Sequence, residues 1–299
     1  MSTLRATLID VGWGDSIFLE TEDANGDPLY ALIDSNDTST LRSSYIFIRR
    51  YLDRKYFLRN QELPPPSQKR VFEWMLVTHA HADHAQGLKR LLQEFGTQQF
   101  WFPNTHLFNP ASSTSKPIFV GSLMNYVRKS KYVGHYDWVD DSKALPNFGA
   151  ATVQVLWPPP NHKDNNENNN SVVLAMTLGD VSFVLTGDIE ADAWNQAGSS
   201  STNLLLSKIP SSTRFFKHPH HGSENGMFET SSSRTPWLNV LGSSAQIAIS
   251  SHVRPFSFPS PDVIQELTKR GYEYYRTDEN HHITVTTDGV RTWTEYSHV

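Results

Sequence analysis

The sequence predicts an α+β fold in which two β-sheets pack face to face and helices cover their outer faces. Strand-like runs followed by helical segments occur in both halves of the chain, an order that favours stacked sheets with helices outside. A dense group of histidines and aspartates follows one buried strand-like run in the first half. With 299 residues, 38% of them hydrophobic, the chain is long enough for one sizeable core. We therefore expect one domain over residues 1–299.

The first half begins with strands. Residues 3–20 alternate around a glycine turn, as a pair of strands does, and residues 29–33 predict a third strand that ends at Asp34. Apolar side chains recur at helical spacing over residues 40–58, which predicts a packing helix with a solvated basic face. The other elements predicted in this half are a buried strand over 72–77, a helix over 84–95, a strand over 99–102 and a helix over 118–129.

The second half repeats the pattern of strands and helices. Its predicted elements are strands over 151–157, 171–176, 181–185, 214–217, 245–249, 283–287 and 292–296, and a helix over 261–271. Residues 161–170 are a run rich in Asn, Asp and Glu. Nothing in this run is suited to burial, so we expect a mobile loop there.

Composition limits the kind of site and partner. The chain has no cysteine, so any metal must be bound by His, Asp, Glu, Asn and water. A formal net charge of -5 argues against a surface that grips bulk duplex through many phosphates, and leaves a short or single-stranded substrate open. The sequence shows neither a basic-then-apolar leader nor an apolar stretch of membrane-spanning length. We expect a cytoplasmic protein without a membrane partner, and we assign no protein partner.

Residues 78–84 carry most of the chemistry. They place His79, His81, Asp83 and His84 between a strand-like run and a helical segment. Imidazole nitrogens and carboxylate oxygens are ligands that Zn²⁺, Mn²⁺ and Fe²⁺ accept, and the intervening alanines let the backbone fold tightly. A solvated polar loop is the alternative, but the strand before this stretch and the amphipathic run after it favour a metal loop.

Other short motifs occur in the same order as in a known family. They lie at residues 10–16, 32–34, 186–190 and 220–223. With the loop at 78–84, they resemble the metallo-β-lactamase superfamily, and within it the branch that includes the hydrolase domain of competence-type DNA-uptake proteins. The resemblance covers nearly the whole chain. It implies a four-layer αββα sandwich with two mixed sheets and a hydrolytic metal centre at one edge, between the halves.

The resemblance also implies roles for individual residues. Two divalent metal ions, zinc or manganese, are expected as cofactors. The expected metal ligands are His79, His81, Asp83, His84, Asp188 and His221, and the expected catalytic residues are Asp83, Asp188, His220 and Glu190. Asp188 would bridge the two ions, because a two-metal site needs a shared carboxylate. His221 is assigned to metal and His220 to substrate or proton transfer, and the order of the pair stays open.

Two further residues complete the expected site. In the family, an aspartate at the position of Asp34 braces the metal loop through hydrogen bonds, and the alternative reading is a cap on the following helix. Asn170 stands where many members carry a further histidine, so it is a weak ligand or a hydrogen-bond partner. One metal position would then be more open to water and better suited to Mn²⁺.

Three functions are compatible with these residues. The favoured one is a phosphodiesterase or nuclease in which hydroxide bound between two metal ions attacks phosphorus, with a phosphodiester, nucleotide or short single-stranded nucleic acid as substrate. The pairing of Gly-Asp-x-Glu at 187–190 with His-His-Gly-Ser at 220–223 favours phosphorus, because it resembles the DNA-uptake and phosphorylcholine-esterase branch. The second is hydrolysis of a lactone, thioester or β-lactam. The third is a binding protein that keeps a relict metal site.

Overall fold

The computed structural model describes residues 2–109, 115–196 and 204–297. Its larger sheet has eight strands in the order β14-β13-β1-β2-β3-β4-β5-β6. The strands are β1 (Leu4–Leu8), β2 (Ile17–Glu22), β3 (Pro28–Ile33), β4 (Phe72–Leu76), β5 (Thr97–Pro103), β6 (Val133–Val139), β13 (His282–Thr287) and β14 (Thr292–Ser297). Neighbours are antiparallel from β14 to β3 and parallel from β3 to β6.

The smaller sheet has six strands in the order β12-β11-β10-β9-β8-β7. They are β7 (Thr152–Trp157), β8 (Val173–Leu178), β9 (Val181–Leu185), β10 (Thr213–Lys217), β11 (Gln246–Ile249) and β12 (Glu273–Arg276). Pairing is antiparallel from β7 to β9 and parallel from β9 to β12. Both sheets are therefore mixed, as expected from the sequence.

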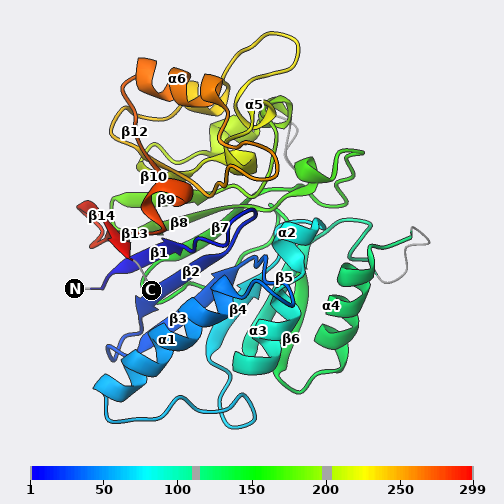
Figure 1. Ribbon diagram of the computed structural model, residues 1–299, viewed down its shortest axis with the longest axis vertical. Helices are drawn as coiled ribbons and strands as arrows, with labels where there is room; N and C mark the ends of the chain where they lie inside the picture. The colour runs from blue at the N-terminus through cyan, green and yellow to red at the C-terminus, as the bar shows by residue number, and fades with distance from the viewer. Residues whose placement is uncertain (1, 110–114, 197–203, 298–299) are drawn as a thin grey trace.

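Helices lie on both outer faces, as Figure 1 shows. The α-helices are α1 (Ser43–Leu58), α2 (Ala82–Ala85), α3 (Leu88–Phe95), α4 (Ile118–Lys129), α5 (Glu224–Met227), α6 (Pro261–Lys269) and α7 (Thr277–Asn280). Short 3₁₀ helices are η1 (Glu167–Asn170), η2 (Ala191–Asn195), η3 (Leu205–Lys208), η4 (Pro219–Gly222) and η5 (Trp237–Asn239). Among the described residues, no helix has both the length and the apolar character needed to cross a membrane.

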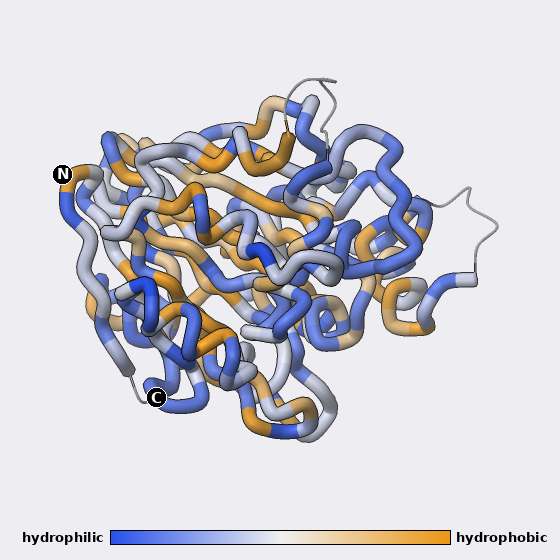
Figure 2. Tube along the Cα trace, turned by 90° about the horizontal axis from the view of Figure 1, so that it is seen from above, coloured by the Kyte–Doolittle hydropathy of each residue, from blue (hydrophilic) through white to orange (hydrophobic). Residues whose placement is uncertain are grey.

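Three apolar clusters hold these layers together. One contains inward-facing residues of both sheets, such as Trp74 and Phe183. A second joins the large sheet to α1, α3 and α4, and a third joins the small sheet to α6 and the 3₁₀ helices. Figure 2 shows hydrophobic stretches of chain running through the interior of the trace. The clusters explain why central strands such as β4 and β9 are nearly continuous apolar runs, since both of their faces are covered.

The ends of the parallel strands position the site. Strands β1, β3 and β4 run in one direction, because β1 and β3 are both antiparallel to β2, so their carboxyl ends meet at one edge of the large sheet. The carboxyl ends of β9, β10 and β11 share an edge of the small sheet in the same way. Backbone bonding joins the two edges, with the Val172 amide donating to the Thr78 carbonyl at 3.0 Å. Ligands of a site can then come from both sheets.

One expectation from the sequence is wrong. Residues 161–170 were expected to be a mobile loop with nothing buried, but their last four residues form η1, and Asn168 and Asn170 are buried. The Glu167 carboxylate accepts a hydrogen bond from the Ala80 amide at 3.0 Å, and Asn166 caps η1 by accepting from the Asn168 amide. Polar side chains that satisfy one another can be buried, which composition alone does not reveal.

Candidate metal centre

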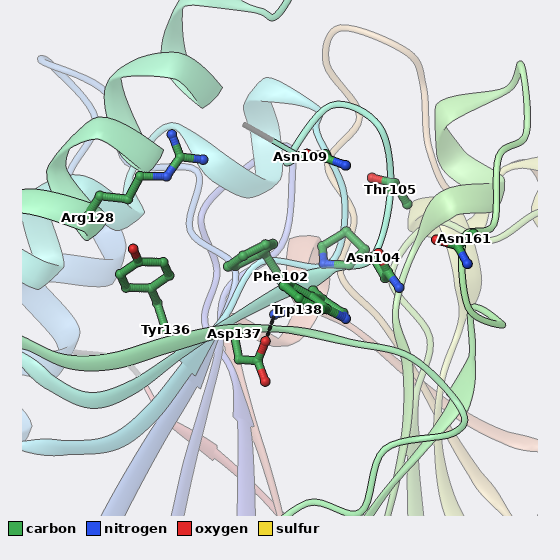
Figure 3. A pocket seen from close by; sticks show the side chains of 10 residues that line it. Phe102, Asn104, Thr105, Asn109, Arg128, Tyr136, Asp137, Trp138 and Asn161 are labelled. Atoms are coloured by element: carbon green, nitrogen blue, oxygen red, sulfur yellow. Dashed lines mark hydrogen bonds between the residues drawn. The ribbon is translucent and has the colours of Figure 1, made fainter. Parts of the chain in front are cut away.

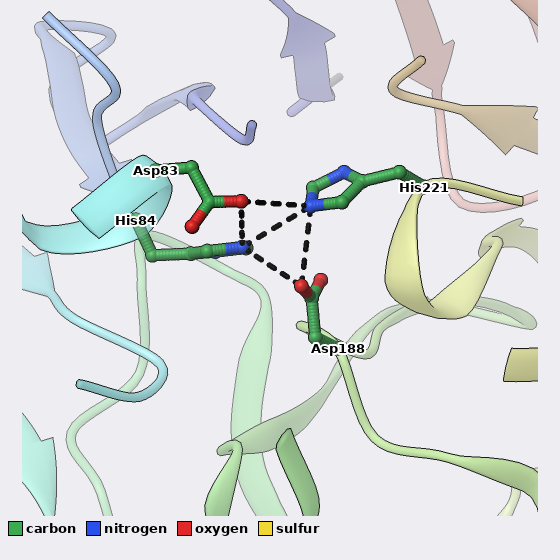
Figure 4. Close-up of side chains that lie close together, drawn as sticks. All are labelled: Asp83, His84, Asp188 and His221. Atoms are coloured by element: carbon green, nitrogen blue, oxygen red, sulfur yellow. Dashed lines mark hydrogen bonds and ion pairs between the residues drawn. The ribbon is translucent and has the colours of Figure 1, made fainter. Parts of the chain in front are cut away.

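Four side chains from three segments converge between the sheet edges, as Figure 4 shows. Asp83 and His84 lie on α2, Asp188 follows β9, and His221 lies in η4 after β10. Nε2 of His84 and Nε2 of His221 are each 3.1 Å from Oδ2 of Asp188, and they are 3.3 Å from each other. Oδ2 of Asp83 lies 3.5 Å from Nε2 of His84 and 3.3 Å from Nε2 of His221.

These distances fit a tetrahedral metal ion. With metal–nitrogen and metal–oxygen bonds of about 2.0–2.1 Å, the ligand atoms of a tetrahedral site lie about 3.3–3.4 Å apart. The five separations given above run from 3.1 to 3.5 Å, and all four residues are buried. Two imidazoles and two carboxylates form a donor set that divalent zinc or manganese accepts.

The other ring nitrogens of the two histidines are already engaged. Nδ1 of His84 donates to Oδ2 of Asp34 at 2.7 Å, and Nδ1 of His221 donates to the Ser250 carbonyl at 3.0 Å. Asp34 also accepts from the amide and hydroxyl of Thr78, at 2.7 and 2.6 Å. The Nε2 lone pairs of His84 and His221 therefore face each other. Two facing lone pairs repel unless a proton or a cation lies between them.

Without metal, protons take that place. Burial lowers the pKa of His84, but the carboxylates of Asp188, Asp83 and Asp34 outweigh it and raise that pKa well above its usual value. Burial also opposes the protonated form of His221, yet Asp188 and Asp15 raise its pKa to about 10. Burial raises the pKa of Asp188, but its interactions with His221 and His84 outweigh burial and hold that pKa well below the usual range. The pocket is built for a positive charge.

His79 and His81 lie beside the cluster. Nε2 of His79 is buried, has no hydrogen-bond partner among the described residues, and is 3.9 Å from Oδ2 of Asp188. The centre of the His79 ring lies 4.6 Å from that of His81 and 4.2 Å from that of His84. Burial lowers the pKa of both His79 and His81, so both imidazoles can offer a lone pair. These two residues could hold a second cation next to Asp188.

Asn168, and not Asn170, adjoins this second position. The Asn168 side chain donates to Glu190 at 2.9 Å and lies close enough to His81 to influence its pKa. The Asn170 amide instead holds its own segment together, since it donates to the Asp164 carbonyl and to the Glu167 carboxylate. The sequence does not separate neighbouring asparagines in a run of three.

The structure separates His220 from His221. Both have left-handed backbone, with φ of 48° and 54°. This turn sends His221 into the ligand cluster and leaves His220 on the wall, with Nδ1 3.5 Å from the Glu190 carboxylate. Left-handed backbone at two successive histidines is costly and is typical of functional sites. Glu190 also accepts from Asn225 at 2.7 Å, so it positions its neighbours and does not join the ligand cluster.

Sequence reasoning gave no role to Lys217. It is the last residue of β10 and is fully buried, with Nζ 2.5 Å from Asp15 and 3.7 Å from Asp188. Nζ also donates to the Gly187 carbonyl at 2.9 Å. Burial lowers the pKa of Lys217, but Asp15 and Asp188 raise it further, so the ammonium stays charged. The available signal was a lysine that ends an apolar strand three residues before His220.

Lys217 also determines which acidic group can hold a cation. Asp15, Asp34 and His84 form a second cluster of the right size. Its charge is already balanced, because Lys217 pairs with Asp15 and His84 donates to Asp34. The group with Asp83, His84, Asp188 and His221 is thus the better candidate for a metal.

Two glycines allow the loops to approach closely. Gly187 has φ of +57°, and a Cβ there would lie 3.0 Å from the Ser171 side chain and 3.1 Å from Thr78. Gly14 has φ of +106°, and a Cβ there would lie 2.5 Å from the Asp83 carbonyl. Only glycine fits such positions without displacement of the metal loop or of Asp188.

The cluster opens into a cavity of about 370 Å³. Trp13, Phe256 and Phe258 form an apolar side, and His81, Asp83, Asp188, His220 and His221 form the other. Trp13 meets Phe256 edge to face, with ring centroids 5.4 Å apart. A substrate would therefore present a polar, charged group to the cluster and an apolar group to the aromatic wall.

The fold and this site define an α+β protein with a buried candidate metal centre between two mixed sheets. No family model matches the chain. It is 22% identical over 276 residues to ComE operon protein 3 of Bacillus subtilis (strain 168), covering 91% of this chain and 32% of that protein. It is 23% identical over 213 residues to the uncharacterised protein YcaI of Escherichia coli (strain K12), covering 71% of this chain and 23% of that protein. The chain thus spans a third or less of the length of these curated relatives.

Proposed function

We propose that this protein is a metal-dependent phosphodiesterase or nuclease with a metallo-β-lactamase type of fold. The observation that carries the proposal is the set of four converging ligand atoms, five of whose separations are 3.1–3.5 Å, with His79 and His81 close by. The similarity to ComE operon protein 3 over 91% of the chain supports it.

Each part of the site has a place in this proposal. Asp83, His84, Asp188 and His221 would hold one cation, and His79, His81 and Asp188 a second. When bound, the cations would act as Lewis acids toward the phosphoryl group and make water a better nucleophile. Asp34 and the Ser250 carbonyl fix the two imidazoles so that Nε2 faces the cluster.

His220 is suited to proton transfer. It lines the cavity, and its Nδ1 lies near the Glu190 carboxylate. Burial lowers the pKa of His220, partly offset by Asp188, so the neutral ring is favoured at neutral pH. The Glu190 carboxylate would orient the ring, so that Nε2 takes up a proton from solvent and the imidazolium gives it to the leaving oxygen of a diester.

The second cation position favours phosphorus over carbonyl carbon as the target. It offers two imidazoles, and the neighbouring side chain is the amide of Asn168, a poor zinc ligand. Positions left to solvent suit a substrate that binds through its own non-bridging oxygens, as a phosphodiester does. A β-lactam offers no such pair of oxygens.

Metal content and turnover test the proposal together. We expect elemental analysis of protein prepared without chelator to find zinc or manganese, and bis(p-nitrophenyl) phosphate to be hydrolysed faster than a β-lactam. Asp188→Ala should lower turnover of the diester by more than about a hundredfold. Loss of a residue that only hydrogen bonds to a metal ligand typically costs less than this. Asp180→Ala, on the turn before β9, is the matched control. Absence of transition metal, or near-normal turnover by Asp188→Ala at saturating metal, would contradict the proposal.

A further inference from the structure

A second cavity, of about 500 Å³, opens beside strand β6 (Figure 3). None of the residues that line it lines the cavity of the metal centre. The two nevertheless lie on the same edge of the large sheet, because β4, β5 and β6 are parallel and the metal loop follows β4. The carboxyl ends of β4 and β6 are two strands apart, or about 10 Å at the usual strand spacing.

One wall of this cavity is aromatic. Tyr136 and Trp138 occupy alternate positions of β6, so they lie on one face of it, and they are 40% and 48% exposed. Figure 3 shows Trp138 next to Phe102 from the end of β5. Nζ of Lys143 lies 4.4 Å from the centre of the Trp138 ring. Exposed aromatic side chains beside a cavity are suited to stacking against a planar ring.

The rim carries positive charge. Nη2 of Arg128 donates to the Phe108 carbonyl at 3.5 Å, and Lys116 donates to the Asn109 carbonyl. Burial and the nearby Arg128 guanidinium lower the pKa of Lys116, so the two cations lie close enough to repel each other. The Asp137 carboxylate also lines the cavity, but it pairs with Lys143, and none of the ion pairs among the described residues includes Arg128 or Lys116. Two such cations on a protein of net charge -5 favour an anionic ligand.

The floor holds a polar group without a partner. The Thr105 hydroxyl is buried, and no hydrogen-bond partner for it lies among the described residues, although the residue lines the cavity. Asn161 adds a side-chain amide on the side away from Tyr136 and Arg128, as Figure 3 shows. A buried hydroxyl that faces a cavity is satisfied when a ligand brings a donor or acceptor.

We propose that this cavity binds one nucleotide of a substrate strand, with its base against Trp138 and Tyr136 and its phosphate at Arg128 and Lys116. The inference rests on the proposed function and names its substrate as single-stranded nucleic acid or a nucleotide diester. A nucleotide joins a planar ring and an anionic phosphate in one unit, which matches an aromatic wall next to paired cations. The Thr105 hydroxyl then meets a polar edge of the base or sugar. An acidic peptide would satisfy the cations but leave the aromatic wall uncovered.

Binding of AMP tests this site apart from turnover. EDTA removes bound metal, so that binding of the phosphate group to the metal centre does not contribute. Calorimetric titration under this condition should show that AMP binds more tightly than adenosine or inorganic phosphate. We expect Trp138→Ala and Arg128→Gln each to raise the Kd for AMP roughly tenfold, as the loss of one stacked base or one charge-assisted contact does. Trp138→Phe keeps a ring and should bind nearly as wild type. Lys129→Gln removes the adjacent charge on α4 and is the matched control.

Turnover gives the second measurement. The ratio of kcat/KM for a deoxyadenylate tetranucleotide to that for methyl p-nitrophenyl phosphate should fall about tenfold in Trp138→Ala and Arg128→Gln. The nucleotide site is refuted, even if diesters are hydrolysed, when AMP does not bind or binds all variants equally. It is also refuted if the substitutions weaken the binding of tetraglutamate and not that of AMP. If AMP binds as expected and neither diester is hydrolysed, the nucleotide site stands and the proposed function fails.

Discussion

His220 and His221 are neighbours in the sequence, yet their left-handed backbone sends only His221 into the ligand cluster. His220 stays on the cavity wall beside Glu190. Under the proposed function, this division of the pair would separate metal binding from proton transfer. An imidazole that has taken up a proton can give it to the leaving oxygen, which speeds the reaction only when that oxygen needs a proton.

We predict that His220→Gln slows hydrolysis of a dinucleotide by about 10²–10⁴-fold, the usual contribution of a positioned acid or base. The same variant should slow bis(p-nitrophenyl) phosphate much less, because p-nitrophenolate leaves without a proton. Turnover of both substrates at several pH values measures the difference. Equal losses on the two substrates would instead assign His220 to positioning of the metal loop. Metal content equal to wild type is the accompanying control.

The asparagines of η1 allow a paired test at the second cation position. Asn168 contacts His81, whereas the amide of Asn170 is used by Asp164 and Glu167. We predict that Asn168→His tightens Zn²⁺ binding and reduces any preference for Mn²⁺, because it adds a third imidazole. Asn170→His should not do so, and it should lower stability by about 1–3 kcal/mol through the broken bonds. Metal titration and urea unfolding of both variants distinguish these outcomes. Tighter zinc binding by Asn170→His alone would reverse the assignment.

At the scale of elements, strand β10 and the turn after β1 are joined by a buried ion pair. Lys217 pairs with Asp15 and also bonds the Gly187 carbonyl next to Asp188. The lysine thus links the turn after β1 to the two loops of the small sheet that carry Asp188 and His221. The mutual attraction of a buried ion pair adds little to the free energy of unfolding, because both charges are desolvated. Removal of one partner is nevertheless strongly destabilising, because it leaves the other charge buried and unpaired.

We predict that Lys217→Met destabilises the protein by about 3–5 kcal/mol, the cost of an uncompensated buried charge. Asp15→Asn with Lys217→Met should recover much of that loss, since neither charge then remains. Urea unfolding of both single variants and the double variant forms the cycle. Additive losses would show that the two side chains act independently. Metal affinity should stay low in the double variant, because the bond to Gly187 is missing.

The elements that sequence periodicity predicts are largely those observed. The strand at 72–77, the strands at 171–176 and 181–185 and the helix at 118–129 are confirmed to within a few residues, because each is a local pattern of apolar side chains. Three features depend on partners far away in sequence, such as Ala80 and Asp15. They are the burial of η1, the choice of Asn168 over Asn170 as the neighbour of His81, and the contacts of Lys217. No local pattern encodes those pairings.

At the scale of the whole molecule, two sheets with the same arrangement bring their carboxyl ends together. The large sheet supplies His79, His81, Asp83 and His84, and the small sheet supplies Asp188 and His221. Each group is incomplete alone, because the tetrahedral set needs two residues from each sheet. Metal binding is therefore linked to docking of the sheets, and a bound ion stabilises the native state by mass action.

This linkage predicts opposite pH dependences with and without metal. In the metal-free protein the pKa of His221 is about 10, against an ordinary value near 6.5 when unfolded. The folded state therefore holds a proton that the unfolded chain has lost. This stabilising contribution is complete below about pH 6.5 and is lost as pH rises through about 10. Metal displaces the proton, so metal binding strengthens over the same range.

We therefore expect the metal-free protein in EDTA to lose stability between pH 7 and pH 9, with a slope of at most about 1.4 kcal/mol per pH unit for each proton. His84 contributes in the same direction, since its pKa is also raised. With saturating Mn²⁺, the urea midpoint should fall less or rise over the same interval. His221→Asn should reduce the metal-free slope, whereas His135→Asn, an exposed position on β6, should leave it unchanged. If the slope of stability against pH in the metal-free protein is identical in wild type and His221→Asn, His221 holds no extra proton in the folded state. A shared proton would then not explain the close approach of the ligand atoms.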